Sequence, residues 1–170
     1  MKLYTKFILP FPLLVLYAFA FTGTFSACSK EDDISIYPIQ EGRFDLSEDE
    51  YVTMQIVNED RTNNSSAFLR IENHTEKRLD YGTNFTLQYH NKNSWEPDLL
   101  HGFEWELIGC GLGTDETEER VNIVPFVKTY NKNKKGRYKL TKQFDLMSDW
   151  PLGTGDVISG IILSTEFEIK

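Results

Sequence analysis

The chain has 170 residues and is acidic, with 26 aspartates and glutamates against 18 lysines and arginines and a formal net charge of −8. Such a surface repels nucleic-acid phosphates and anionic lipid head groups, so neither is expected as a partner. The length is enough to bury a hydrophobic core without disulfide bonds.

The first 27 residues have the layout of an export signal. Lys2 and Lys6 give a positive start, residues 7–21 are almost wholly apolar, and small residues follow. The apolar run is shorter than the roughly 20 residues that a membrane-spanning helix needs, and two prolines interrupt it. We therefore predict a cleaved signal peptide over residues 1–27, with an uncleaved membrane anchor as the less favoured alternative.

The residues before Cys28 resemble the lipobox of bacterial lipoproteins. In that motif the cysteine becomes the lipidated first residue of the mature protein, and here Phe25 stands where Leu is usual. Residues 29–33 (Ser-Lys-Glu-Asp-Asp) are similar to the tag that sends some Gram-negative lipoproteins to the outer face of the outer membrane, although like charges also keep a plain tether extended. The resemblance implies a lipid anchor at Cys28 in the outer membrane, exposed at the cell surface. A periplasm-facing anchor is the alternative.

The rest of the chain is predicted to be a tether followed by one all-β domain. Residues 28–50 are polar and contain turn formers, so we expect a lipidated linker that leads into a domain over residues 51–170. In that domain, short runs place apolar side chains at every second position, the period of a strand with one face in a core. The runs cover residues 52–56, 67–71, 85–89, 103–107, 138–144 and 161–169. Residues 120–127 add an apolar run in which the pattern does not decide which side chains face the core. About seven strands without a strong amphipathic helix predict an antiparallel β-sandwich.

An acidic loop is expected over residues 109–119. Asp115, Glu116, Glu118 and Glu119 offer oxygen ligands for calcium, but they lack a regular Asp-x-Asp-x-Asp pattern, so a solvated loop is the favoured interpretation. Cys110 lies in the same loop and has no partner if Cys28 carries lipid. A lone cysteine between two glycines is more often a small buried hydrophobe than a reactive thiol. The sequence does not assign a role to Cys110 or to the acids.

Residues 51–170 resemble a bacterial immunoglobulin-like domain. The resemblance follows an ordered series of short stretches, at residues 52–54, 71–73, 79–82, 95, 136–140, 142, 144 and 166–169. The stretch Gly136-Arg137-Tyr138 is the most characteristic of them. The family implies an antiparallel immunoglobulin-like sandwich without a disulfide bond. It implies no activity, because this fold carries its function in loops and local sites.

Few side chains suggest a catalytic or metal-binding site. The histidines at positions 74, 90 and 101 lack the spacing of a metal site, and no nucleophile, base and orienting residue form a set. We therefore expect neither an enzyme nor a cofactor or metal. The favoured interpretation of Lys142 is an ordinary lysine at a strand end. The alternative is that Lys142, which shares the inward parity of Leu140 and Phe144, lays its stem on the core while its ammonium reaches solvent or pairs with an acid.

Two tryptophans are the candidate binding residues. Trp95 lies in a predicted hairpin and Trp150 in a loop, and exposed aromatic rings often anchor a sugar or a partner protein. For Trp95, core packing is the favoured interpretation and binding the alternative, whereas neither is favoured for Trp150. We predict a lipid-anchored cell-envelope protein whose domain is a binding or structural module for an unknown envelope protein or glycan. One alternative is a surface carbohydrate-binding lipoprotein, which needs both tryptophans on one face. The other is a fimbria-like assembly subunit, which needs an exchangeable edge strand.

Overall fold

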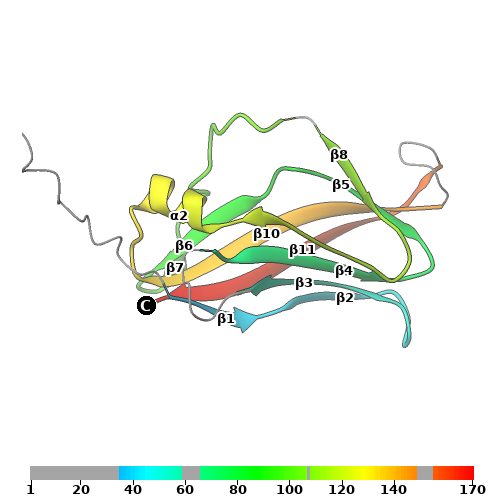
Figure 1. The fold of residues 1–170 in the computed structure, drawn as a ribbon, viewed down its shortest axis with the longest axis horizontal. Helices are drawn as coiled ribbons and strands as arrows, with labels where there is room; N and C mark the ends of the chain where they lie inside the picture. The colour runs from blue at the N-terminus through cyan, green and yellow to red at the C-terminus, as the bar shows by residue number, and fades with distance from the viewer. Residues whose placement is uncertain (1–34, 59–65, 107, 149–154) are drawn as a thin grey trace, which may run out of the picture. The chain divides into compact units, whose positions relative to one another are not determined.

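The computed structural model describes residues 35–58, 66–106, 108–148 and 155–170, which form two antiparallel sheets packed face to face (Figure 1). The larger sheet contains β1 (Ile36–Gln40), β5 (Arg78–Gly82), β6 (Thr86–Asn91), β7 (Ser94–Trp95), β8 (Gly109–Leu112), β10 (Gly136–Met147) and β11 (Val157–Ile169). The smaller sheet contains β2 (Gly42–Asp45), β3 (Tyr51–Val57), β4 (Phe68–His74) and β9 (Glu116–Asn122), and a helix, α2 (Val124–Asn131), follows β9. The predicted antiparallel β-sandwich is confirmed.

The long strand β10 organises the larger sheet. On one side it pairs with β11 along its whole length, and on the other side it pairs with β6 near its start and with β5 near its end. Between β5 and β6 the chain bulges at residues 83–85, beside a stretch of β10 that has no strand partner on that side. This bulge leaves backbone carbonyls that another group must satisfy.

The register of the strands defines two ends of the sandwich. At the near end, Gly136 of β10 and Ile36 of β1 both lie opposite Ile169 of β11. At the far end, Met147 of β10 lies opposite Arg78 of β5, next to the turns that follow β2, β4 and β8.

The core lies between the sheets and follows the period-two pattern of the sequence. The largest fully buried side chains are Tyr138, Phe144, Phe167, Met54, Ile56, Leu69, Leu79, Leu87, Ile123, Leu140, Leu146 and Ile161. The rings of Tyr138 and Phe167 stack with their centroids 5.3 Å apart. Because each large side chain contributes roughly 1.5–3 kcal/mol on burial, these aromatic and aliphatic contacts dominate the stability of the sandwich.

Tyr138 fastens the start of β10 to the segment before it. Its hydroxyl donates a hydrogen bond to the carbonyl of Lys134 and accepts one from Asn131 Nδ2 at 2.8 Å. Burial raises the pKa of Tyr138 to about 12. Gly136 adopts φ +135°, and a Cβ there would lie 2.9 Å from Tyr89 Oη, so the Tyr89 ring also requires glycine at this position.

Two strands lie inside the segment expected to be a tether. β1 and β2 join opposite sheets, and the chain passes between them at Gly42, where a Cβ would lie 2.6 Å from the carbonyl oxygen of Ser164. Of the five residues of β1, only Ile36 is buried. An edge strand held mainly by backbone hydrogen bonds leaves little periodicity in the sequence, which is why the sandwich begins earlier than expected.

The segment expected to be a strand at residues 103–107 is different in the structure. Residues 103–106 form no strand, and residue 107 lies outside the described part. The rings of Phe103 and Trp105 instead pack on Phe126 of α2, with centroids 5.9 Å and 5.8 Å from it. The alternation therefore reflects rings that cover a helix rather than a strand that lines a sheet.

The next two segments also differ from expectation. The expected loop at residues 109–119 contains β8 and the start of β9, which belong to opposite sheets. Residues 120–127 contain the end of β9 and the start of α2. The proline at position 125 suits the first turn of a helix, where its missing N–H costs nothing. No helix in the described residues is long and apolar enough to cross a membrane.

Candidate functional site

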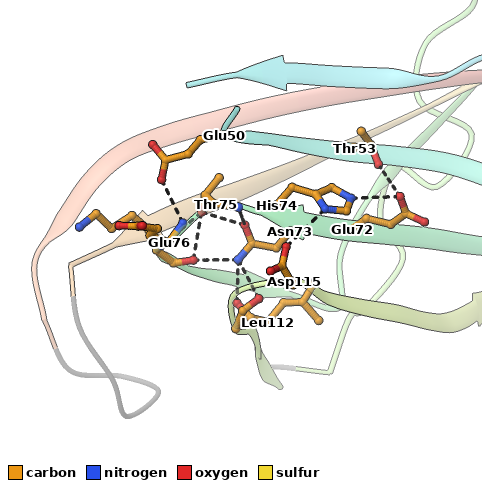
Figure 2. Close-up of polar contacts among 11 residues, drawn as sticks. Glu50, Thr53, Glu72, Asn73, His74, Thr75, Glu76, Leu112 and Asp115 are labelled. Carbon is orange, nitrogen blue, oxygen red and sulfur yellow. Dashed lines mark hydrogen bonds and ion pairs between the residues drawn. The ribbon is translucent and has the colours of Figure 1, made fainter. Parts of the chain in front are cut away.

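Three turns are joined at the far end of the sandwich, and we call them the braced tip. They are the turns at residues 46–50, 75–77 and 113–115. The backbone N–H of Glu76 donates to Glu50 Oε1 at 3.0 Å, which links the first turn to the second (Figure 2). The amide of Asn73 donates to the carbonyl oxygens of Leu112 at 3.2 Å and Gly113 at 3.0 Å, which links the second turn to the third.

Asn73 is the centre of this network and is 0 % exposed. Its Nδ2 also donates to the carbonyl of Lys77 at 2.8 Å, and its Oδ1 accepts hydrogen bonds from the backbone N–H and the hydroxyl of Thr75, at 3.2 Å and 2.9 Å (Figure 2). Both ends of the amide are therefore satisfied inside the protein. A buried polar group with all its partners fixes its surroundings in one conformation.

His74 adds a second link between the turns. Its Nε2 lies 3.4 Å from Glu72 Oε2 and its Nδ1 lies 3.6 Å from Asp115 Oδ1 (Figure 2). Its ring centroid lies 4.5 Å from that of Tyr51. The imidazole thus stands between two carboxylates, one on its own strand and one on the neighbouring turn. Protonation of His74 would create ion pairs to both.

The surface of the braced tip is acidic. Its exposed carboxylates belong to Glu48, Asp49, Glu76, Asp115 and Glu116. The acids predicted at residues 115–119 do not converge on one point: the backbone N–H of Gly113 donates to Glu116 Oε2 at 2.6 Å, Glu119 pairs with Arg70, and Glu118 lines a cavity between the sheets. Within the described ranges, no group of three or more His, Cys, Asp or Glu residues is arranged to hold a metal.

Trp95 lies toward the near end, on the larger sheet. It is half-buried beside His90, with ring centroids 5.0 Å apart. The Nζ of Lys139 lies 4.6 Å and the guanidinium carbon of Arg137 lies 5.9 Å from the Trp95 ring centroid, and Arg137 pairs with Glu166. A ligand at this ring must share it with the protein's own cations. Trp95 stays a candidate binding residue, whereas Trp150 and Cys28 lie outside the described residues.

Lys142 points into the protein, in line with its parity, so the favoured interpretation of an ordinary strand-end lysine is wrong. It is 3 % exposed, and its ammonium donates to the carbonyl of Gly82 and to that of Asn84, the latter at 2.9 Å. These carbonyls belong to the bulge between β5 and β6, so the ammonium neither reaches solvent nor forms an ion pair with a described acid. Burial lowers the pKa of Lys142 to about 8, while the charges of Cys110 and Glu118 act in the opposite direction.

The remaining candidates from the sequence are dispersed. Cys110 is a half-buried free thiol on β8. His90 lies beside Trp95, whereas His101 is exposed in the segment that follows β7. The three histidines therefore do not come together.

Comparison with known families decides what kind of domain this is. Residues 48–157, which run from the turn before β3 to the start of β11, match the sequence model of the bacterial Ig-like domain. The chain belongs to this family. No significant match was found among curated proteins or among solved structures. Bacterial Ig-like domains are typically non-catalytic modules. In this Ig-like domain, Tyr138 has the geometry of the tyrosine corner, in which a hydroxyl near the start of the sixth strand bonds a backbone carbonyl a few residues upstream.

The braced tip of the Ig-like domain was not predicted from the sequence. Asn73 follows Ile71 at the same inward parity of β4, and a polar residue at a core position is the signal that was available. The partners of Asn73 come from turns that are distant in the sequence. Their approach depends on the packing of one sheet against the other, which a local pattern does not encode.

Proposed function

We propose that the protein is a lipid-anchored, non-catalytic binding module of the cell envelope, and that it contacts a partner protein through the braced tip. The residues around Cys28 support the anchor, and membership of the bacterial Ig-like family supports a module without catalysis. The observation that carries the choice of surface is the buried amide of Asn73, which holds neighbouring turns together.

The length of the chain between anchor and domain favours the far end as the contact surface. A lipid on Cys28 is separated from Ile36 of β1 by a segment that spans at most about 28 Å when fully extended. Ile36 lies at the near end, whereas the braced tip lies at the opposite end of the 12-residue strand β10, a further 35–40 Å or so away. A domain tethered in this way presents its far end to molecules that approach the membrane.

The braced tip also suits recognition physically. Turns that are already fixed by hydrogen bonds lose little conformational entropy when they bind. The exposed carboxylates at this end complement a basic surface and accelerate encounter with it. The proposed partner is therefore an envelope or external protein with a basic patch.

The anchor and its membrane face are tested by protease treatment of intact cells. Cys28→Ala should release the domain from the membrane fraction, and loss of the wild-type domain from intact cells should show surface exposure. Retention of the Cys28→Ala protein in the membrane would contradict the lipid anchor. Protection of the wild-type domain until the membrane is broken would place it on the periplasmic face.

The contact surface is tested by crosslinking on cells that carry the anchored protein. The double variant Glu76→Lys/Asp115→Lys reverses charge at the braced tip, and Glu41→Lys/Glu104→Lys makes the same charge change at exposed sites away from it. The tip variant should lose the crosslinked species that wild type and control both form. Equal crosslinking by both double variants would contradict the tip as the contact surface.

One observation favours assembly as a second candidate function. β1 is an edge strand on β11, and Tyr37 and Ile39 are each 47 % exposed, so few side-chain contacts hold β1 in place. A copy of β1 from another molecule could replace it, as a fimbria-like subunit requires. A disulfide between Tyr37→Cys and Glu168→Cys, which are opposite each other, should block such assembly in a Cys110→Ser background. Oligomers that persist in the oxidised protein would exclude strand exchange.

A further inference from the structure

A cavity of about 200 Å³ lies between the two sheets, next to the bulge that separates β5 from β6. Its apolar wall includes Leu69 and Ile71 of β4 and Val121 of β9. Its polar wall includes Lys142, Tyr81 and Glu118. An apolar cavity of about 150 Å³ is known to hold benzene, so this one has room for a slightly larger molecule.

The Lys142 ammonium has no carboxylate in direct ion-pair contact among the described residues, although the charges of Cys110 and Glu118 favour its protonated form. An ammonium has three N–H donors, and in Lys142 the carbonyls of Gly82 and Asn84 account for two bonds. The ammonium forms no ion pair with any acid in the described part of the chain. Burial of a charge without an ionic partner is costly, so an anion that reaches this cavity gains an unusually strong interaction.

The Tyr81 hydroxyl is the second unsatisfied donor at the same cavity. Tyr81 is 9 % exposed, and its buried hydroxyl has no hydrogen-bond partner among the described residues. Its ring centroid lies 5.1 Å from Lys142 Nζ, and both residues line the cavity. A buried hydroxyl without a protein partner is rare in a folded protein, so an acceptor that reaches this hydroxyl would satisfy it.

We propose that this cavity binds a small carboxylic acid with an apolar body, whose carboxylate accepts hydrogen bonds from Lys142 and Tyr81. The body of the ligand would pack on Leu69, Ile71 and Val121. Glu118 also lines the cavity, from β9, and the ligand would carry its carboxylate toward Lys142 and Tyr81. Cys110 of β8 is the fourth titratable group at the cavity. The inference is independent of the anchor and of the braced tip.

The charge requirement is tested by calorimetry on the full-length protein with benzoate and hexanoate as probes. Benzamide and hexanamide have nearly the same shapes without the charge. The carboxylates should bind saturably, and the amides should bind at least tenfold more weakly. Above pH 8 the affinity for the carboxylates should fall by about tenfold per pH unit, because Lys142 loses its proton. Equal binding of acid and amide, or no saturable binding of either carboxylate, would overturn the proposal.

Variants identify the groups that hold the carboxylate. Lys142→Met should abolish binding, whereas Lys139→Met, which removes a lysine from the same strand outside the cavity, should leave it unchanged. Tyr81→Phe should weaken binding several-fold without loss of thermal stability, because the hydroxyl it removes has no partner. Tyr81→Phe protein that binds benzoate like the wild type would contradict the assigned geometry even if Lys142→Met fails to fold.

Discussion

The amide of Asn73 on β4 donates to the carbonyl of Leu112 on β8 at 3.2 Å, and this bond joins the two sheets at the far end of the sandwich. Loops that carry function on a β-sandwich are usually held by the strands beneath them. Here the turns are also held to one another, through one side chain that is 0 % exposed. Asn73 therefore braces the tip from inside, alongside the bond from Glu76 to Glu50 and the contacts of His74.

Asn73→Ala should lower the free energy of unfolding by about 2–4 kcal/mol, because several buried partners lose their hydrogen bonds together. Urea unfolding measures this change. Amide hydrogen exchange should also accelerate in the turns at residues 75–77 and 113–115. Asn91→Ala, which removes an exposed bond to Glu96 Oε1, is the matched control and should change stability by less than about 0.5 kcal/mol. Similar losses in both variants would show that the hydrogen bonds of Asn73 add no more to the free energy of unfolding than an exposed hydrogen bond does.

Tyr138→Phe tests the tyrosine corner. Removal of the hydroxyl leaves Asn131 Nδ2 and the carbonyl of Lys134 without their partner, and we expect a loss of about 1–3 kcal/mol by urea unfolding at pH 7. Tyr37→Phe removes a hydroxyl from a half-exposed ring and should be neutral.

The same hydroxyl gives a pH dependence. Its pKa in the folded protein, about 12, is above the ordinary value of 10.0, so the folded state favours the neutral form. The stability that Tyr138 contributes is fully present below pH 10 and is lost as the pH rises toward 12. The stability difference between wild type and Tyr138→Phe should therefore shrink between pH 10 and pH 11.5. A constant difference across this range would show that Tyr138 ionises normally.

Lys142 should have the opposite effect on stability. Its pKa is lowered from 10.5 to about 8 in the folded protein, so the folded state binds fewer protons than the unfolded state between these values. The cost of burying the ammonium is fully present below pH 8 and disappears as the pH rises to 10.5. Relative to Lys142→Met, the wild type should gain about 2–3 kcal/mol between pH 7.5 and pH 10. Lys139→Met is the control and should follow the wild type at every pH. Parallel pH profiles for the wild type and Lys142→Met would contradict the lowered pKa.

The parts of the fold that follow a local period could be predicted from the sequence. Tyr138, Leu140 and Phe144 alternate with polar residues and are buried, and the inward direction of Lys142 follows from the same parity. The pattern did not show what Lys142 contacts, because its carbonyl partners exist only where the chain bulges between β5 and β6. The packing of Trp105 against α2 and the partners of Asn73 likewise depend on contacts between segments that are distant in the sequence.

Gly136 provides a direct test of the contact between Tyr89 and the start of β10. Gly136→Ala must place a Cβ 2.9 Å from Tyr89 Oη at a φ of +135°, which an L-residue with a side chain rarely adopts. We expect a loss of about 2–4 kcal/mol in urea unfolding, with part of it recovered when Tyr89→Ala removes the ring in a double variant.

Gly109→Ala is the matched control, because nothing lies within 4 Å of the point where its methyl group would stand and its backbone is outside the left-handed region. That substitution should be neutral or slightly stabilising, since alanine restricts the unfolded chain more than glycine does. Equal effects of the two alanines would mean that Tyr89 moves freely and that the near end of β10 is packed less tightly than the ring contacts indicate.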